Sequence, residues 1–161
     1  MTAAPKTDVL VELHVPDLRA AKAFYRRFKF AVVREEAADD ADGYLVMRRG
    51  SSVLSFWGGT KAVRDHEYFR RFRNVRKRGY GVELVIPVDD LDAAYRAAVA
   101  ADCVVAQPQT RAWGARDFRA EDPFGFYLRF TEPHDPIGRS APRPAARRQL
   151  NGRPARARPR P

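Results

Sequence analysis

Cysteine and long apolar runs are nearly absent from this sequence of 161 residues. The single Cys103 excludes an internal disulfide and a cysteine-based metal cluster, so disulfide scaffolds and zinc ribbons are ruled out. No apolar stretch approaches the roughly 20 residues that span a bilayer, and the first eight residues lack the apolar stretch of a signal peptide. We therefore expect a cytoplasmic protein with no membrane partner.

Acidic residues are scarce in only one part of the chain. Of the formal net charge of +10, residues 1–132 contribute little, because they contain 22 Lys and Arg against 19 Asp and Glu. Residues 133–161 contain eight arginines, one acidic residue and seven of the 12 prolines, a composition that predicts a disordered tail. Two roles stay open for this tail. It could contact a polyanion such as nucleic acid, or it could only solubilise the protein, which its lack of aromatic residues favours.

The rest of the chain predicts a compact fold built from a repeated pattern. Alternating apolar residues indicate a strand within residues 8–15, and Asp17 is a suitable N-cap for a helix from Leu18 to about Phe28. Three further strands are expected at 31–34, 43–48 and 52–57, which gives the order β-α-β-β-β.

The same order recurs 73 residues later. A strand at 81–88 is followed by Asp90 as the cap of a helix over 91–101, and strands are expected at 104–106, 115–120 and 126–131. We therefore predict an α+β fold with two tandem β-α-β-β-β modules, whose curved mixed sheets surround a cleft. In this organisation one domain over 1–132 contains module one at 8–58, a linker at 59–79 and module two at 80–132.

Arginines and aromatic residues alternate in part of this linker. Over residues 61–78 the three aromatics Tyr68, Phe69 and Phe72 fall at helical spacing, which predicts an amphipathic helix docked on the domain. The alternative is a basic surface for polyanions or a lid over the cleft. We expect His66 in the linker and His134 in the tail to be exposed rather than catalytic.

Several motifs of the chain are typical of one known superfamily. They are Val15-Pro16-Asp17-Leu18 followed by Phe24-Tyr25, Val88-Asp89-Asp90-Leu91, Trp113-Gly114-Ala115-Arg116-Asp117-Phe118, and Asp122-Pro123-Phe124-Gly125 before the final strand. With them, residues 8–132 resemble the vicinal oxygen chelate superfamily, which includes glyoxalase I, extradiol dioxygenases and bleomycin resistance proteins. The resemblance is strongest to the bleomycin-resistance branch. The two modules would enclose a ligand cavity by pairing within one chain or between two chains, and we expect a homodimer.

The resemblance also implies four metal-ligand positions, which fall on Leu10, Ser55, Glu83 and Arg129 in this sequence. Only Glu83 is a good oxygen ligand, and a guanidinium cannot coordinate a cation. We therefore expect neither a metal nor another cofactor. A displaced site made of His14, Glu12 and Glu83 is an alternative that no metal-ligand spacing supports.

The function predicted from these features is binding of a small aromatic or amphipathic molecule, with no catalytic residue assigned. In this hypothesis the protein sequesters its ligand without a metal, as an antibiotic resistance protein does. The slightly basic core argues against a strongly cationic ligand such as bleomycin. The candidate ligand-binding residues are Trp113, Phe118, Phe56, Trp57, Glu83, Arg129, Glu12 and His14.

Alternatives stay open for the candidate residues and for the function. Phe56 and Phe118 serve equally well as core residues, and Glu83 is expected to form an ion pair with Arg129 because an unpaired buried charge is costly. The protein could instead be a metal-dependent lyase, isomerase or dioxygenase. It could also associate with nucleic acid or another polyanion through the basic tail.

Overall fold

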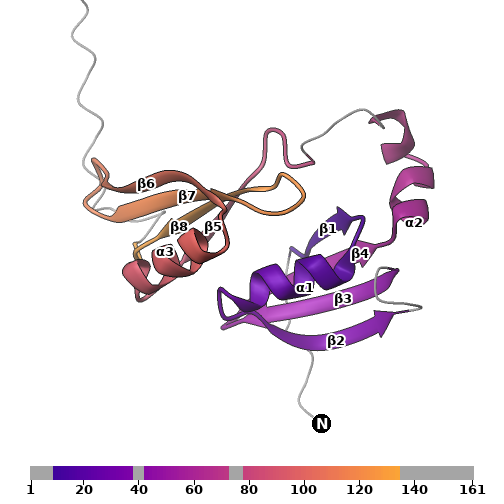
Figure 1. The fold of residues 1–161 in the computed structure, drawn as a ribbon, viewed down its shortest axis with the longest axis horizontal. Helices are drawn as coiled ribbons and strands as arrows, with labels where there is room; N and C mark the ends of the chain where they lie inside the picture. Colours follow the sequence, from indigo (N-terminus) through magenta and orange to yellow (C-terminus); the bar gives the residue numbers. More distant parts are fainter. Residues whose placement is uncertain (1–8, 38–41, 73–77, 135–161) are drawn as a thin grey trace, which may run out of the picture.

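The computed structural model describes residues 9–37, 42–72 and 78–134, which form two modules with the same order of elements (Figure 1). The α+β fold with two tandem βαβββ modules is therefore confirmed. The predicted disorder of the tail concerns residues 135–161 almost entirely, and these lie outside the described residues.

Module one contains β1 (Val11–Val15), α1 (Leu18–Arg26), β2 (Ala31–Ala37), β3 (Gly43–Arg49) and β4 (Ser52–Gly58). Its four strands form one sheet in the order β1-β4-β3-β2, in which β1 and β4 are parallel and the other neighbours are antiparallel. Asp17 caps α1 as predicted, because its Oδ1 accepts a hydrogen bond of 3.0 Å from the backbone N–H of Ala20.

Module two repeats this plan with β5 (Glu83–Pro87), α3 (Leu91–Ala100), β6 (Val104–Thr110), β7 (Arg116–Glu121) and β8 (Tyr127–Thr131). The strand order is β5-β8-β7-β6, with β5 parallel to β8. Asp90 caps α3 by accepting a hydrogen bond of 2.8 Å from the N–H of Ala93. The two N-caps therefore occupy equivalent places in the repeat.

The linker does not form the single amphipathic helix that the sequence predicted. It contains α2 (Thr60–Asp65) and a short 3-10 helix, η1 (Phe69–Phe72), while residues 73–77 lie outside the described part. The helix ends at His66, where the backbone is extended (φ −52°, ψ 128°). The Nδ1 atom of His66 accepts hydrogen bonds from the N–H groups of Tyr68 and Phe69, which stabilises a turn in place of a continuous helix.

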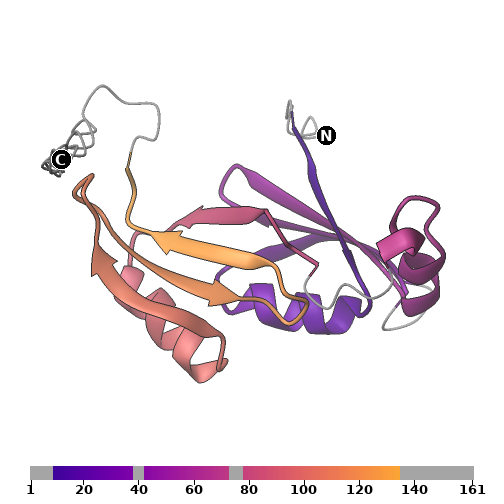
Figure 2. The same cartoon turned by 90° about the horizontal axis from the view of Figure 1, so that it is seen from above.

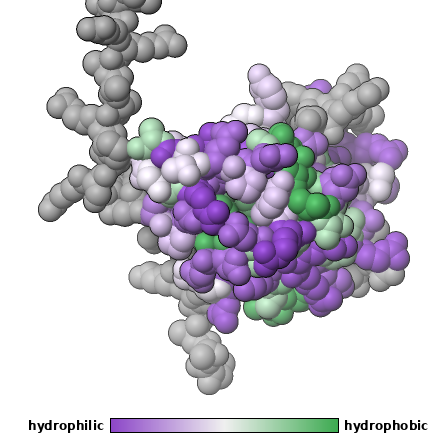
Figure 3. Space-filling model, turned by 60° about the vertical axis from the view of Figure 1, so that its left-hand side comes forward, coloured by the Kyte–Doolittle hydropathy of each residue, from purple (hydrophilic) through white to green (hydrophobic). Residues whose placement is uncertain are grey.

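Each sheet has one face covered by its helix and one open face. Alternate residues of β1, such as Leu13 and Val15, are buried against α1, whereas Glu12 and His14 lie on the open face. Both helices lie on the same side of the molecule in Figure 2. The surface seen in Figure 3 is mainly hydrophilic, with a smaller apolar area in its middle.

The two modules share one hydrophobic core. The rings of Phe28, at the end of α1, and Phe130, in β8, have their centroids 4.4 Å apart. The hydroxyl of Tyr25 donates a hydrogen bond of 3.0 Å to Oδ2 of Asp122, and Arg49 Nη1 donates one of 2.6 Å to a backbone oxygen at the end of β5. These contacts join the α1 region and the end of β3 to β8, to the turn before it and to the end of β5.

No helix in the described part is long and apolar enough to cross a membrane.

Candidate ligand-binding site

A pocket of about 640 Å³ lies at the junction of the modules, beside the open face of β1. Three parts of the chain enclose it: β1, the linker with α2 and η1, and the loops at the start of β5 and β8. The lining residues are Glu12, His14, Pro16, Thr60, Val63, Arg64, Phe69, Arg78, Tyr80 and Phe126. The pocket therefore combines apolar and aromatic walls with a few ionisable groups.

His14 is the most enclosed polar group of this pocket. Its Nε2 lies 3.2 Å from Oε1 of Glu12, and its ring centroid lies 5.0 Å from those of Trp57 and His66 and 4.8 Å from that of Phe69. Burial lowers the pKa of His14, although the carboxylate of Glu12 acts in the opposite direction. The ring is therefore neutral near neutral pH. Its buried Nδ1 has no hydrogen-bond partner within the described structure.

Two arginines also line the pocket. Arg64 comes from α2, and Arg78 precedes β5 with its backbone N–H bonded to the carbonyl oxygen of Phe124 at 3.2 Å. Partial burial lowers the pKa of Arg78, but its guanidinium stays charged at neutral pH. Neither side chain forms an ion pair with another residue in the described ranges.

A second, shallower hollow of about 570 Å³ adjoins the first, since Tyr80 borders both. It lies over the open face of module two and is lined by residues of β5, β6, β7 and β8 with the adjoining loops. Glu83, Arg119 and Glu121 provide its charges, and Val105 and Tyr127 provide apolar surface. The two hollows therefore share one lining residue, Tyr80, which is 93% exposed.

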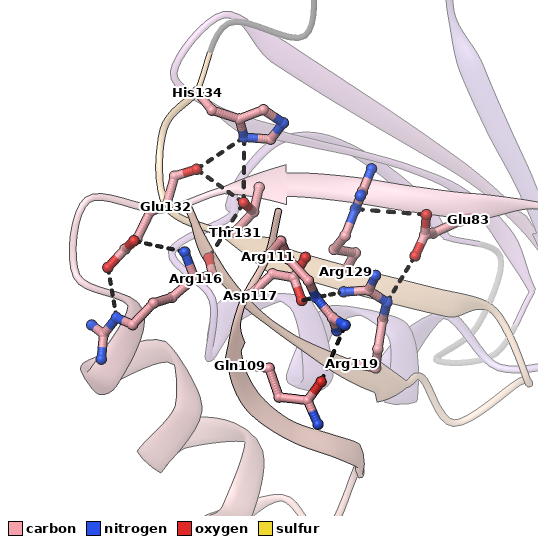
Figure 4. A network of polar contacts seen from close by, with 10 residues as sticks. All are labelled: Glu83, Gln109, Arg111, Arg116, Asp117, Arg119, Arg129, Thr131, Glu132 and His134. Atoms are coloured by element: carbon pink, nitrogen blue, oxygen red, sulfur yellow. Dashed lines mark hydrogen bonds and ion pairs between the residues drawn. The ribbon is translucent and has the colours of Figure 1, made fainter. Parts of the chain in front are cut away.

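A network of ion pairs crosses the open face of module two (Figure 4). Arg119 Nε lies 3.0 Å from Oε1 of Glu83, and its Nη1 lies 2.7 Å from Oδ1 of Asp117. Asp117 is completely buried and also accepts a hydrogen bond of 2.6 Å from Arg111 Nε. The predicted pair of Glu83 with Arg129 is present but longer, at 3.6 Å. The principal partner of Glu83 is thus Arg119, which the sequence did not single out.

The four positions at which the superfamily resemblance placed metal ligands do not fit a divalent cation. Glu83 faces two guanidinium groups, Leu10 is apolar, and Arg129 cannot coordinate a metal. Ser55 is buried, and its hydroxyl has no hydrogen-bond partner in the described structure. Among the described residues no group of three His, Cys, Asp or Glu side chains could hold a metal ion, so the displaced site of His14, Glu12 and Glu83 is not formed.

The predicted aromatic site residues separate into two groups. Trp57 packs edge-on against His14, and Trp113, which is 38% exposed, lies under the guanidinium of Arg129 at 5.9 Å from its ring centroid. Phe56 and Phe118 are completely buried on the helix-facing sides of their sheets. Phe56 contacts Tyr25 of α1, and Phe118 contacts Tyr95 of α3, so both occupy the core position that the sequence left as the alternative.

The remaining polar residues have structural partners. Arg116 binds Glu132 at 2.8 Å and Asp92 at 3.3 Å, and Nδ1 of His134 lies 3.2 Å from the carbonyl oxygen of Glu132. His66, expected to be exposed, is half-buried against the ring of His14. Sequence reasoning did not select eight of the ten pocket residues, namely Pro16, Thr60, Val63, Arg64, Phe69, Arg78, Tyr80 and Phe126. Six of them belong to the linker or the residue just after it, where basic and aromatic composition was the only signal.

Comparison with known proteins agrees with this architecture. The family model of the Glyoxalase/Bleomycin resistance protein/Dioxygenase superfamily matches residues 9–130. No curated protein matches the chain.

Three solved structures illustrate the likeness. A protein of unknown function from Agrobacterium tumefaciens is 20% identical with a TM-score of 0.62, and the match covers 83% of this chain and 98% of that one. A bleomycin resistance determinant encoded on transposon Tn5 is 20% identical (TM-score 0.52, coverage 81% and 100%). A lactoylglutathione lyase from A. tumefaciens is also 20% identical (TM-score 0.54, coverage 80% and 96%). At this identity the likeness shows the fold alone.

Proposed function

The chain belongs to the glyoxalase/bleomycin resistance protein/dioxygenase superfamily, and on this basis we propose that it binds a small aromatic or amphipathic molecule without a metal ion. The pocket at the module junction carries the proposal. Its volume of about 640 Å³ falls in the range of small-molecule sites, and such sites combine apolar walls with few polar groups. Val63, Phe69 and Phe126 supply the apolar walls, and His14 with Glu12 supplies polarity.

Sequestration requires affinity and no chemical step. The fold alone is compatible with sequestration and with catalysis, because a resistance determinant and a lyase share it. The donor groups of this chain favour binding, since the metal-ligand positions hold an ion-paired Glu83 and Arg129. A ligand larger than the first pocket would extend over Tyr80 toward Arg129 and Trp113, and antibiotic resistance by sequestration is the biological role that fits this activity.

We further propose that two copies of the chain associate. The strands β1 and β5 are at the ends of their sheets, with one neighbouring strand each in the described structure. Near β5, Val82 is 52% and Val85 is 41% exposed, and unpaired strand edges with apolar side chains favour pairing. Sedimentation analysis of Val85→Lys tests this proposal. We expect this variant to be monomeric, whereas the control Val99→Lys on α3 stays dimeric, and a monomeric wild-type protein would contradict the proposal.

A thermal-shift screen tests the binding function. The purified full chain is heated with aromatic acids, amphipathic antibiotics including bleomycin, and separately with Mn, Ni, Zn and Fe ions. A molecule that binds only the folded state raises the apparent stability. We expect organic compounds to raise the melting temperature of the wild-type protein and of Val99→Ala, but less that of Phe69→Ala, which removes a pocket wall.

Two outcomes of the screen would contradict the proposal. Stabilisation by micromolar metal ions would indicate a metal site, contrary to the donor chemistry at Glu83 and Arg129. Organic ligands that stabilise Phe69→Ala as strongly as wild type would bind elsewhere. The variant Trp113→Ala then shows whether the site extends onto module two, because this side chain covers Arg129 and contributes little to the core.

A further inference from the structure

We propose that the ligand is an anion, namely an organic acid with an aromatic or apolar body, and that its acidic group binds to Arg78 and Arg64. This inference rests on the proposed function and adds the chemical class of the ligand. It follows from the charges of the pocket walls and from the environment of Arg78.

The ionisable groups of the pocket have an excess of positive charge. They are Glu12, His14, Arg64 and Arg78. The one carboxylate, Glu12, lies 3.2 Å from Nε2 of His14, and burial keeps that imidazole neutral near neutral pH. The two guanidinium groups have no carboxylate within ion-pair distance among the described residues. An anion entering the pocket therefore meets two cations, whereas a cation meets two like charges.

Arg78 is placed to bind such an anion. Its backbone is fixed by the hydrogen bond to the carbonyl oxygen of Phe124, and the adjacent Gly79 N–H donates to the carbonyl oxygen of Gly125 at 3.3 Å. Arg78 is exposed enough for a ligand to reach it, while its partial desolvation carries a cost that lowers its pKa. A carboxylate or phosphate would offset this cost through charge-assisted hydrogen bonds, which a planar guanidinium can make in pairs.

His14 adds no charge to the pocket near neutral pH. When Nε2 donates to Glu12, Nδ1 has a free lone pair, but this atom is buried without a partner in the described structure, so a ligand does not reach it in this arrangement. We expect the apolar body of the ligand to contact Val63, Phe69 and Phe126, which line the same pocket.

Three probes of nearly equal size isolate the effect of charge. They are para-hydroxybenzoate, para-hydroxybenzamide and para-hydroxybenzylamine, which share a phenol and differ in carrying a negative, no or a positive charge. Isothermal titration calorimetry with the full chain measures each affinity. We expect the acid to bind about tenfold or more tightly than the amide, as a charge-assisted hydrogen bond is worth about 1.5–3 kcal/mol, and the amine to bind most weakly.

Matched variants separate the pocket from other basic regions. Arg78→Gln removes a lining cation, and Arg70→Gln removes an exposed arginine of η1 that does not line the pocket. Both variants leave the arginines of residues 133–161 unchanged. We expect Arg78→Gln to reduce the affinity for para-hydroxybenzoate about tenfold and to leave that for the amide unchanged, while Arg70→Gln binds all three probes as wild type does.

The outcomes distinguish this inference from the proposed function. Preference for the amine, equal binding of acid and amide, or equal losses in the two variants would overturn the anion assignment, although the protein would still bind small molecules. If none of the three probes binds at millimolar concentration while the wider screen finds neutral or cationic ligands, the anion assignment is wrong and the binding function stands. If the wider screen also finds no ligand, both proposals fail.

Discussion

The hydrogen bond between Tyr25 and Asp122 predicts how strongly the two modules depend on each other. Tyr25 lies in α1 and Asp122 lies in the turn between β7 and β8, 97 residues later in the chain. Both residues are buried, and the phenol donates to Oδ2 of the carboxylate at 3.0 Å. The substitution Tyr25→Phe removes this donor and keeps the ring in the core.

The expected loss of stability follows from the hydrogen bonds that the Asp122 carboxylate keeps. Oδ1 of Asp122 still accepts the backbone N–H groups of Phe124 at 2.9 Å and Phe126 at 2.8 Å, so the turn itself keeps its hydrogen bonds. Oδ2 loses its donor in a site that water does not readily reach. Because hydrogen bonds to charged groups contribute about 1.5–3 kcal/mol, we expect Tyr25→Phe to lower the free energy of unfolding by that amount near neutral pH.

The same substitution has a predictable pH dependence. Burial raises the pKa of the Asp122 carboxyl, and the hydrogen bonds from Phe126, Phe124 and Tyr25 oppose that rise. Because its pKa is raised, the Asp122 carboxyl binds a proton more tightly in the folded protein than in the unfolded chain. The stability gained from this proton is full at a pH below the pKa of the unfolded chain, and it is lost as the pH rises through the pKa of the folded protein. Removal of the Tyr25 donor raises the pKa further. The destabilisation by Tyr25→Phe is therefore largest near neutral pH. It is smaller in acid, where the Asp122 carboxyl is protonated in both the folded and the unfolded protein.

Urea denaturation followed by far-UV circular dichroism measures these free energies for the wild-type protein and the variant. Tyr95→Phe is a matched control, since its ring packs on Phe118 and the described structure shows no hydrogen bond from its hydroxyl. The control should change stability by less than about 0.5 kcal/mol. A similarly small effect of Tyr25→Phe, or a large one that does not diminish in acid, would refute the assigned role of the Tyr25–Asp122 contact.

Three further substitutions or measurements address the core, the pocket and its histidine. Phe28→Ala should lower stability to denaturant by about 3–5 kcal/mol because it removes the ring that packs on Phe130, and a loss under ~1 kcal/mol would show that the modules do not share a core. Gly79→Ala places a Cβ 2.7 Å from the Cα of Phe126, so it should cost about 1–3 kcal/mol in thermal unfolding and weaken ligand binding; unchanged stability would contradict this close approach. NMR titration should give His14 a pKa below 6.5, so that stability decreases as pH falls from 6.5 through the folded pKa, and a measured value above 6.5 would contradict its buried, neutral state.

The repeat could be predicted from the sequence because its signals are local. Helix capping by Asp17 and Asp90 depends on residues three positions apart, and both caps are present in the structure. Strand β6 was expected to end at residue 106 and instead continues to Thr110. It does so as an edge strand with irregular register after residues 104 and 106, and an edge strand tolerates the proline at position 108.

The face on which each aromatic residue lies could not be predicted in the same way. In β4 the consecutive Phe56 and Trp57 point to opposite faces, and both are apolar, so alternation alone does not say which one meets the helix. The pairing of Phe56 with Leu13 in β1 decides it, because Leu13 is on the face that α1 covers. This information lies in the register between strands that are distant in sequence.

The ion-pair network was accessible in part from the sequence. Asp117 and Arg119 are two residues apart on one strand, so they lie on the same face, and that face was already assigned to the cleft through Glu83 and Arg129. Adding Arg119 to this set required only the period of a strand. The pocket walls from the linker required the structure, because the turn at His66 sets the direction in which α2 and η1 approach His14.

The charges of the pocket and of the open face of module two support the proposal of ligand binding over metal-assisted chemistry. A metal site supplies positive charge together with an open coordination position, and it needs several convergent oxygen or nitrogen ligands. Here Glu83 is neutralised by Arg119 and Arg129, while Arg64 and Arg78 add positive charge at the adjoining pocket. Guanidinium groups supply charge and directed N–H donors without such a position, so the described residues of the two hollows support the proposed binding of an anion and provide no group of three metal-ligating side chains.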